Sequence, residues 1–168
     1  MAYFNNGLSV SGVSLVNNQV TFKSSKPSVA KVKNNILYAK DNGSYSLTVS
    51  LNSNPALSST ESYVMSGIKK PKANITSVKS KKKKQITVSW KNNIKNVTGY
   101  EIQYSTSKKF TKKTTKTVTA KGKKVKSKKI SKLKSKKTYY VRIRAYKNQS
   151  QGEKFYGKYS KTLKIKVK

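Results

Sequence analysis

The segment YYVRIRAY at residues 139–146 alternates apolar and polar side chains with a period of two. Its odd-numbered positions, from Tyr139 to Ala145, are all apolar or aromatic, while two of its even positions are Arg142 and Arg144. This alternation is typical of a half-buried antiparallel strand. The same period recurs at three other places in the second half of the chain: ITVSW at 86–90, YEIQYS at 100–105 and LKIKV at 163–167. No segment keeps a helical period of 3.6. We therefore predict an all-β fold.

Charge is distributed very unevenly along the 168 residues. The chain has 39 Lys and Arg but only 4 Asp and Glu, so its formal net charge is +35. Residues 1–70 carry 7 lysines and 2 acids, a net charge of +5, whereas residues 71–168 carry 30 lysines, 2 arginines and 2 acids, a net charge of +30. Turn residues surround this step at residues 67–71, and residues 52–60 read as a loop. We predict two domains, residues 1–70 and residues 71–168.

Composition argues against an enzyme. Cysteine and histidine are both absent, so the chain lacks thiolate nucleophiles, imidazole bases and the usual transition-metal ligands. The four acids are at least 20 residues apart, which excludes a carboxylate pair on one helical face: Asp41, Glu61, Glu101 and Glu153. The sequence Asp41-Asn42-Gly43 is better suited to a hairpin turn than to a calcium loop. We expect no catalytic residue, no cofactor and no metal.

The second domain has Trp90 in an alternating strand, Leu133 six residues before Tyr139, and strand-like segments at residues 98–105 and 156–160. With these features, residues 71–168 resemble a fibronectin type III domain of the kind found in bacterial surface proteins. Trp90 matches the buried tryptophan of strand B, and Leu133 followed by Tyr139 matches the leucine and tyrosine-corner pair before strand F. Residues 98–105 resemble strand C, and residues 156–160 resemble the approach to strand G. The resemblance implies a sandwich of seven strands in two sheets, with Trp90, Leu133 and Tyr139 as structural core and no active site.

The first domain contains three characteristic segments: SSKPSVAKV at residues 24–32, NILYAK at 35–40 and GSYSLTVS at 43–50. Their order gives this domain a resemblance to the latter half of a bacterial Ig-like domain of group 2. It implies an abbreviated Ig-like domain, or one whose sheet a neighbouring chain completes, since an exposed strand edge is a template for pairing. With strand-like segments at Leu8–Val16 and Gln19–Phe22, this part is the expected docking part of the protein.

The type III resemblance also implies that three lysine-bearing loops share one end of the sandwich. These loops are A–B, C–C′ and E–F, and together they hold the candidate polyanion-binding residues: Lys81, Lys82, Lys83, Lys84, Lys108, Lys109, Lys112, Lys113, Lys134, Lys136 and Lys137. Lysine is a strongly hydrated point charge, so 37 lysines against 2 arginines favour diffuse attraction over base-specific reading. The alternative interpretation is that these lysines form only a solvated surface.

Three functions remain open. The first is a non-enzymatic decoration protein of a bacteriophage virion, on the capsid or tail. It would dock through residues 1–70, in multiple copies or as a homo-oligomer, and adhere to anionic cell-surface or mucosal polymers. The sequence shows neither a signal-peptide pattern nor a membrane span. This favours a virion protein, which leaves the cell by lysis and is not inserted into a membrane. The second is a bacterial cell-surface adhesin module. The third is a non-specific nucleic-acid-binding protein, supported by charge alone.

Overall fold

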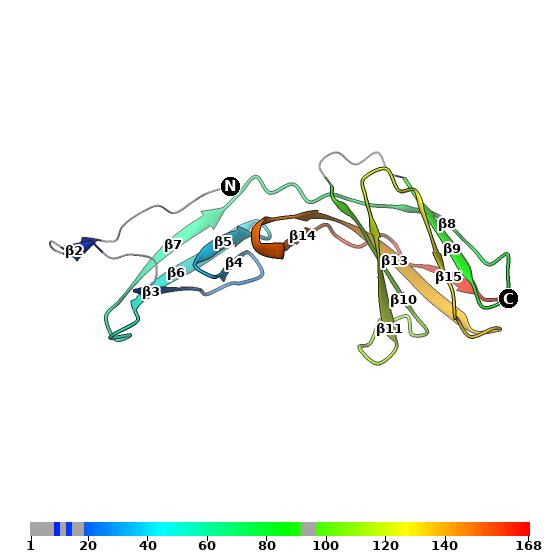
Figure 1. Ribbon diagram of the computed structural model, residues 1–168, viewed down its shortest axis with the longest axis horizontal. Helices are drawn as coiled ribbons and strands as arrows, with labels where there is room; N and C mark the ends of the chain where they lie inside the picture. The colour runs from blue at the N-terminus through cyan, green and yellow to red at the C-terminus, as the bar shows by residue number, and fades with distance from the viewer. Residues whose placement is uncertain (1–8, 11–12, 15–18, 92–96) are drawn as a thin grey trace. The chain divides into compact units, whose positions relative to one another are not determined.

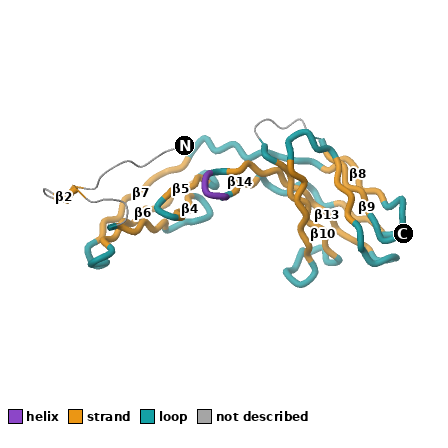
Figure 2. Tube along the Cα trace, viewed as in Figure 1, coloured by secondary structure: helices purple, strands orange, loops and turns teal. Residues whose placement is uncertain are grey.

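A computed structural model describes residues 9–10, 13–14, 19–91 and 97–168, and the chain divides into two compact units, Met1–Lys69 and Lys70–Lys168. Each unit is built of antiparallel strands, and the only helical element among the described residues is a single 3-10 turn, η1 (Ser150–Gly152) (Figures 1 and 2). The predicted all-β fold is confirmed. β-branched and aromatic side chains at period two dictate this outcome, because they suit a pleated surface that is buried on one face.

The first unit contains three small sheets. β3 pairs with β6, which pairs with β7; β4 pairs with β5; and β1 pairs with β2. The strand bounds are β1 (Ser9–Val10), β2 (Val13–Ser14), β3 (Val20–Ser24), β4 (Ala30–Lys33), β5 (Ile36–Ala39), β6 (Gly43–Leu51) and β7 (Ser58–Met65). This strand-rich arrangement is consistent with the Ig-like resemblance of residues 24–50. The rest of the predicted Leu8–Val16 strand lies outside the described residues.

A small apolar cluster holds the first unit together. Val29, Ala30, Tyr45 and Leu47 are buried, and partly buried side chains from β3, β4, β5 and β7 pack around them. The Tyr45 ring stacks on the Tyr63 ring with centroids 5.7 Å apart. Among the residues of this unit that the structure describes, the core is small, and a small core stabilises less than that of an ordinary domain of about 100 residues.

Two local predictions in the first unit need correction. The loop predicted at residues 52–60 is present at residues 52–57 but ends earlier, since β7 begins at Ser58 and pairs with β6. Thr48 and Thr60 share a hydrogen bond of 2.8 Å between their hydroxyls. Asp41-Asn42-Gly43 is not a hairpin turn, since β5 and β6 lie in different sheets. Asn42 instead exchanges two hydrogen bonds with the main chain of Ile68.

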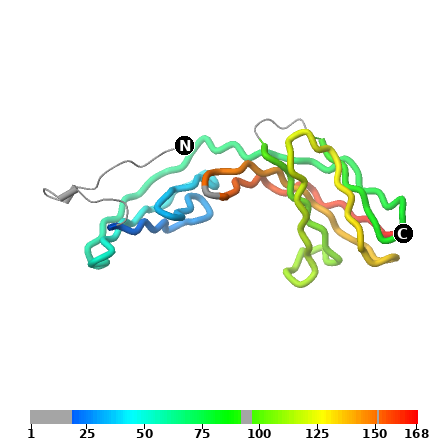
Figure 3. Tube along the Cα trace, in the orientation of Figure 1, coloured from blue at the N-terminus to red at the C-terminus, as the bar shows by residue number. Residues whose placement is uncertain are grey.

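The second unit is a sandwich of two sheets. Chain order follows the colours of Figure 3, and the strands correspond to A, B, C, C′, E, F and a divided G. One sheet has the order β12-β9-β8, and the other has the order β11-β10-β13-β14, with β15 also pairing β13. The strand bounds are β8 (Ile75–Lys79), β9 (Ile86–Trp90), β10 (Gly99–Ser105), β11 (Thr115–Lys121), β12 (Ser127–Ile130), β13 (Thr138–Asn148), β14 (Lys154–Tyr156) and β15 (Leu163–Lys166).

Strand G is divided because Ser160 interrupts its pairing with β13. The Ser160 main-chain N–H donates to the carbonyl of Ile143 at 2.7 Å, while its hydroxyl accepts from the Ile143 N–H at 3.1 Å. A side chain thus takes the place of a main-chain carbonyl at this point of the ladder. The two halves of G remain attached to the same neighbour, so the divided strand still closes the sheet.

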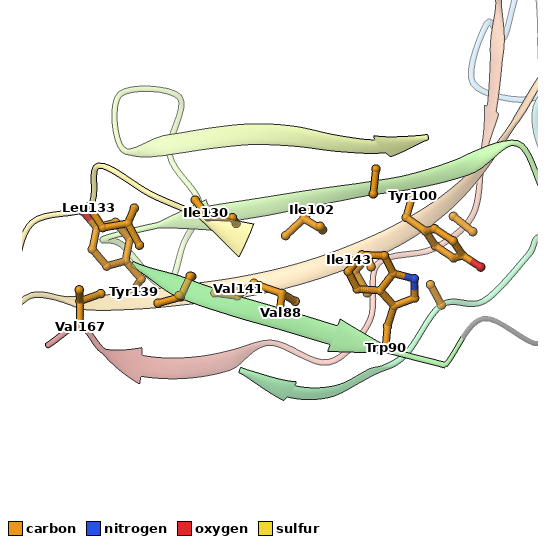
Figure 4. Close-up of a cluster of buried hydrophobic side chains, with 14 of the residues drawn as sticks. Val88, Trp90, Tyr100, Ile102, Ile130, Leu133, Tyr139, Val141, Ile143 and Val167 are labelled. Atoms are coloured by element: carbon orange, nitrogen blue, oxygen red, sulfur yellow. The ribbon is translucent and has the colours of Figure 1, made fainter. Parts of the chain in front are cut away.

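The core of the second unit lies between its two sheets (Figure 4). Trp90, Leu133 and Tyr139 all lie in it; Trp90 is only 3% exposed, and its ring centroid is 5.2 Å from that of Tyr100. The remaining buried members come mainly from the alternate positions of β9, β10 and β13: Ile86, Val88, Tyr100, Ile102, Val141, Ile143 and Ala145. Period-two alternation therefore places one face of each strand inside.

Gly157 is required by a close approach of the backbone. A Cβ built on Gly157 would lie 1.8 Å from the carbonyl oxygen of Pro71, and main-chain atoms cannot rotate away as a flexible side chain can. Gly152 differs, since a Cβ there meets nothing within 4 Å, although its φ of +75° disfavours any L side chain.

We expect Gly157→Ala to lower the free energy of unfolding by about 3 kcal/mol through overpacking. Gly152→Ala, which adds conformational strain alone, should lower it by only about 1 kcal/mol. Guanidinium unfolding of the full chain, followed by Trp90 fluorescence, measures both. Equal losses would show that the approach of Pro71 to Gly157 is not a rigid constraint.

Candidate functional site

The candidate site consists of three loops at one end of the second unit, which we call the basic end. These are residues 80–85 between β8 and β9, residues 106–114 between β10 and β11, and residues 131–137 between β12 and β13. They correspond to the A–B, C–C′ and E–F loops of the sequence analysis. All eleven candidate lysines lie in these loops and are exposed.

Main-chain hydrogen bonds join the A–B and E–F loops directly. The Leu133 N–H donates to the carbonyl of Lys84 at 3.0 Å, and the Lys84 N–H donates to the carbonyl of Lys168 at 2.9 Å. The Lys136 N–H donates to the carbonyl of Val167 at 2.8 Å. The lysines of these two loops are therefore carried by one hydrogen-bonded framework, which includes residues 167–168.

The tyrosine corner connects this framework to the core. Tyr139 is buried, yet its hydroxyl accepts a hydrogen bond of 3.2 Å from the main-chain N–H of Lys134. Leu133 beside it fills the core with its side chain. The E–F loop is thus held at both a polar and an apolar point, which sets the path of the backbone that carries Lys134, Lys136 and Lys137.

The C–C′ loop lies at the same end of its sheet but is held separately. Ser105 pairs with Tyr140 on β13 and with Thr115 on β11, so the loop begins where β13 begins. Its Phe110 ring lies against Arg142, with the guanidinium carbon 4.0 Å from the ring centroid. Among the described residues, the main-chain hydrogen bonds that join the A–B and E–F loops have no counterpart between the A–B and C–C′ loops. The lysines of the C–C′ loop are therefore carried on a separate part of the backbone.

Lysine is also abundant away from the basic end. The C′–E loop and the end of β11, at the opposite end of the strands, carry Lys121, Lys123, Lys124 and Lys126. Positive charge alone therefore does not distinguish the basic end from the rest of the second unit. What distinguishes it is the backbone conformation of some of its lysines.

Three lysines of the basic end adopt left-handed backbone conformations. Lys84 has φ = 54°, Lys132 has φ = 61° and Lys136 has φ = 60°. Together with Phe110, they are the only non-glycine residues with positive φ that the structure describes in the second unit. The C′–E loop instead uses Gly122 for this purpose, with φ = 102°. A left-handed lysine costs about 1–2 kcal/mol relative to its ordinary conformation.

Sequence reasoning did not identify Lys132 as a candidate, and it did not detect the strain at Lys84 and Lys136. Glycine or asparagine is the usual signal for a left-handed residue, and these positions carry neither. Neighbouring lysines with ordinary φ look identical in the sequence. Only the closing of the A–B and E–F turns imposes the conformation.

We expect Lys84→Gly and Lys136→Gly each to raise the free energy of unfolding by about 0.5–1 kcal/mol, because relief of strain outweighs the entropy of glycine in the unfolded chain. Lys83→Gly and Lys137→Gly are the matched controls, since they remove the same charge next door at ordinary φ. They should lower it by about 0.5 kcal/mol. Thermal unfolding separates the pairs, and a loss at Lys84 equal to that at Lys83 would refute strain.

Both arginines of the chain are used in a stack on the outer face of the β10–β13 sheet. The Arg142 guanidinium carbon lies 4.0 Å from the ring centroids of both Phe110 and Tyr159. The Arg144 guanidinium lies 3.6 Å from the ring centroid of Tyr156. Because Arg142 and Arg144 are two residues apart on one strand, their side chains share a face. We call this the arginine–aromatic stack.

Glu101 anchors the stack. It is only 8% exposed, and its Oε1 accepts hydrogen bonds from Arg144 Nε at 2.7 Å and from the Tyr159 hydroxyl at 3.0 Å. Burial raises the pKa of Tyr159 well above its usual range, the Glu101 carboxylate adds to this rise, and Arg144 and Arg142 oppose it. One of the four acids that looked isolated in the sequence is therefore structural.

Because the pKa of Tyr159 is raised in the folded state, the unfolded chain loses this phenol proton at a lower pH than the folded protein does. The stabilisation is therefore fully present below about pH 10, the ordinary tyrosine pKa, and declines above it. At pH 8 we expect the free energy of unfolding of the native protein to be about 1.5 kcal/mol higher than that of the Tyr159→Phe variant. The difference should narrow between about pH 10 and 12. Lysine titration is common to both proteins and cancels. Urea unfolding of both proteins across this pH range measures the difference. A difference in free energy of unfolding that stays constant with pH would contradict the raised pKa of Tyr159.

The described residues contain no group of three or more acidic side chains that could hold a metal ion. No helix in the described part of the chain is both long enough and apolar enough to cross a membrane. The site consists of exposed lysines on a hydrogen-bonded framework, an arrangement able to attract anions.

Comparison with known proteins gives one family. The sequence profile of the family "Fibronectin type III domain" matches residues 69–157. Among solved structures, the type III domain of human contactin 1 is 19% identical, and the match covers 63% of this chain and 87% of that one with a TM-score of 0.48. The type III domain of the human collagen alpha-1(XX) chain is 16% identical and covers 61% and 89%, with a TM-score of 0.46. No curated protein sequence matches the chain.

Proposed function

Because the chain belongs to the fibronectin type III family, whose domains are adhesion or structural modules, we propose that it is an adhesion module that binds anionic polymers through the basic end. Its first unit would dock on a larger assembly, and its second unit would contact teichoic acid, sialylated mucin or a similar polyanion. Family membership also supports a role without catalysis, since type III domains are generally non-catalytic.

The observation that carries the proposal is lysine in left-handed conformations. Lys84, Lys132 and Lys136 occupy positions where glycine would be more stable, and all three lie in the two loops joined into one framework. A strained residue persists where some benefit outweighs its cost, and such positions cluster at functional sites. Local folding does not explain lysine here, whereas a requirement for positive charge does.

Electrostatics supports the proposed ligand class. None of the eleven candidate lysines has a carboxylate partner among the described residues. Their charges are exposed and uncompensated, and they attract a polyanion over about one Debye length, about 8 Å at physiological salt. The two arginines, which could recognise phosphate through paired hydrogen bonds, are engaged in the arginine–aromatic stack. Diffuse attraction is the mode that remains.

For the setting, we propose a bacteriophage particle, with residues 1–70 docked on the capsid or tail. The low net charge of this part, +5 against +30 for the remainder, supports the division of roles, since a docking face must tolerate close contact with protein. A bacterial cell surface is the alternative setting. Mass spectrometry of purified particles and of cell-wall extracts from the same lysate distinguishes the two.

We expect polyanion binding to weaken steeply with salt, because neutralised lysines release counterions. The test variant is Lys84→Asn with Lys132→Asn and Lys136→Asn, since asparagine tolerates left-handed φ. Its control is Lys121→Asn with Lys123→Asn and Lys126→Asn, which removes the same net charge at the opposite end. We measure binding of teichoic acid between about 50 and 300 mM salt and expect the log–log slope to become less steep in the test variant alone, because fewer counterions are released.

Two outcomes would change the conclusion. Equal loss of slope in the test and control variants would show that the whole charged surface, not the basic end, attracts the polymer. Tighter binding of double-stranded DNA than of teichoic acid or sialylated mucin at equal salt would favour the third function, a non-specific nucleic-acid-binding protein. Circular dichroism of each variant confirms that its strands remain.

A further inference from the structure

β7 forms one edge of the three-stranded sheet in the first unit. The strand order is β3-β6-β7, and β7 pairs with β6 along all eight of its residues, Ser58–Met65. Along its outer edge, an end strand presents main-chain N–H and C=O groups to whatever approaches. An edge of eight residues is long enough to accept another strand.

Lysine marks every other edge of the larger sheets but not this one. Among the described sheets of three or more strands, each remaining edge strand contains lysine, the residue that most often blocks edge-to-edge pairing: Lys23 in β3, Lys79 in β8, Lys116 in β11, Lys128 in β12, Lys154 in β14 and Lys164 in β15. By contrast, residues 41–68 contain no lysine and have a net charge of −2. In a chain of net charge +35, the β7 edge lacks this protection.

Exposed apolar side chains occur on both faces of this strand and in the turn before it. Of the four large hydrophobic residues that the structure shows exposed, three lie on β7 or in the turn before it. Val64 is 75% exposed, Leu57 is 61% exposed and Tyr63 is 37% exposed. Exposed apolar surface beside a strand edge is typical of a surface that contacts another protein.

We propose that β7 pairs antiparallel with β7 of a second copy of this chain, about a two-fold axis through Ser62. The resulting sheet would have six strands, β3-β6-β7 followed by β7-β6-β3 of the second copy. This register places Glu61 opposite Tyr63 of the other copy, so that no two carboxylates face one another, and it places Thr60 opposite Val64, so that β-branched side chains meet across the interface. An axis through Glu61 would oppose two carboxylates instead.

Charge places a contact between two copies on this face, and symmetry favours a second copy as the occupant. Two molecules of net charge +35 repel one another over most of their surfaces, and only a lysine-free face allows close approach. Antiparallel pairing about a two-fold axis needs one self-complementary strand, and the Ser62 register makes β7 self-complementary. The inference depends neither on polyanion binding nor on the bacteriophage setting.

Ser62→Lys tests the axis, and Ser46→Lys is its matched control. Ser46 lies directly opposite Ser62 on β6, with 3.2 Å between their hydroxyl oxygens, so both variants lose the same contact and gain the same charge. Only the charge introduced by Ser62→Lys would face its own copy across the axis, where like charges oppose pairing. By sedimentation of the full chain, we expect the dimer Kd to rise about 5-fold for Ser62→Lys and to change less than about 2-fold for Ser46→Lys.

Opposite charges at the axis should restore pairing. An equimolar mixture of Ser62→Lys and Ser62→Glu should dimerise more tightly than either variant alone, because each introduced ammonium group then faces a carboxylate. In addition, the chain has no cysteine, so Ser62→Cys provides a single thiol. Under mild oxidation Ser62→Cys should form disulfide-linked dimers, whereas Ser46→Cys, one strand further from the axis, should not.

Salt separates this inference from the proposed function. Screening reduces repulsion between copies, so pairing through β7 should strengthen as salt rises, whereas polyanion binding should weaken. A full chain that remains monomeric at every concentration and salt would overturn the inference, as would equal effects of Ser62→Lys and Ser46→Lys. Either result would leave the polyanion experiment unaffected.

Discussion

The pairing of β13 with β10 is the contact on which the second unit depends. Seven consecutive residue pairs, from Gly99 with Tyr146 to Ser105 with Tyr140, join these two strands. Their register sends Val141 and Ile143 into the core and leaves the arginines on the opposite face. A slip of one residue would exchange the two faces, burying two guanidinium groups and exposing the apolar set. Register and core are therefore one constraint.

The arginine–aromatic stack makes that constraint stronger. Arg144 on β13 reaches Glu101 on β10, and Tyr159 joins both from the segment between β14 and β15. The stack extends to Phe110 in the C–C′ loop through Arg142. A buried ion pair contributes only when its remaining hydrogen-bonding capacity is satisfied, and the Tyr159 hydroxyl supplies part of that here. The two arginines thus stabilise the fold, and the exposed positive charge of the basic end comes from lysine.

Electrostatic repulsion among the positive charges is the second constraint on the fold. A net charge of +35 on 168 residues disfavours any compact state, and the chain meets this by keeping its lysines in loops and on exposed strand faces. Among the described residues, the first unit has the smaller apolar core, and its sequence carries fewer lysines. The unit with less electrostatic repulsion is thus also the one with less apolar burial. The lysine-free segment at residues 41–68 is an exception that the net charge of the chain conceals.

Much of the fold could be predicted from particular residues. Alternation in YYVRIRAY and in ITVSW was sufficient for the all-β class, and Trp90, Leu133 and Tyr139 were sufficient for the type III resemblance, which the family match confirms. β7 was missed because SSTESYV alternates small polar residues with few apolar ones, so its identity as a strand comes from pairing with β6. Period-two alternation reports burial, and β7 is almost entirely exposed.

The candidate site divides in the same way. The sequence by itself determined the amount of charge, the preference for lysine and the absence of thiol and imidazole chemistry, because these are properties of composition. Tertiary structure decided which lysines are strained, which loops share a framework, and which acid is buried. Backbone φ at Lys84 and Lys136 follows from closing turns between strands far apart in the chain, and such long-range closure leaves no local signal in the residues that carry it.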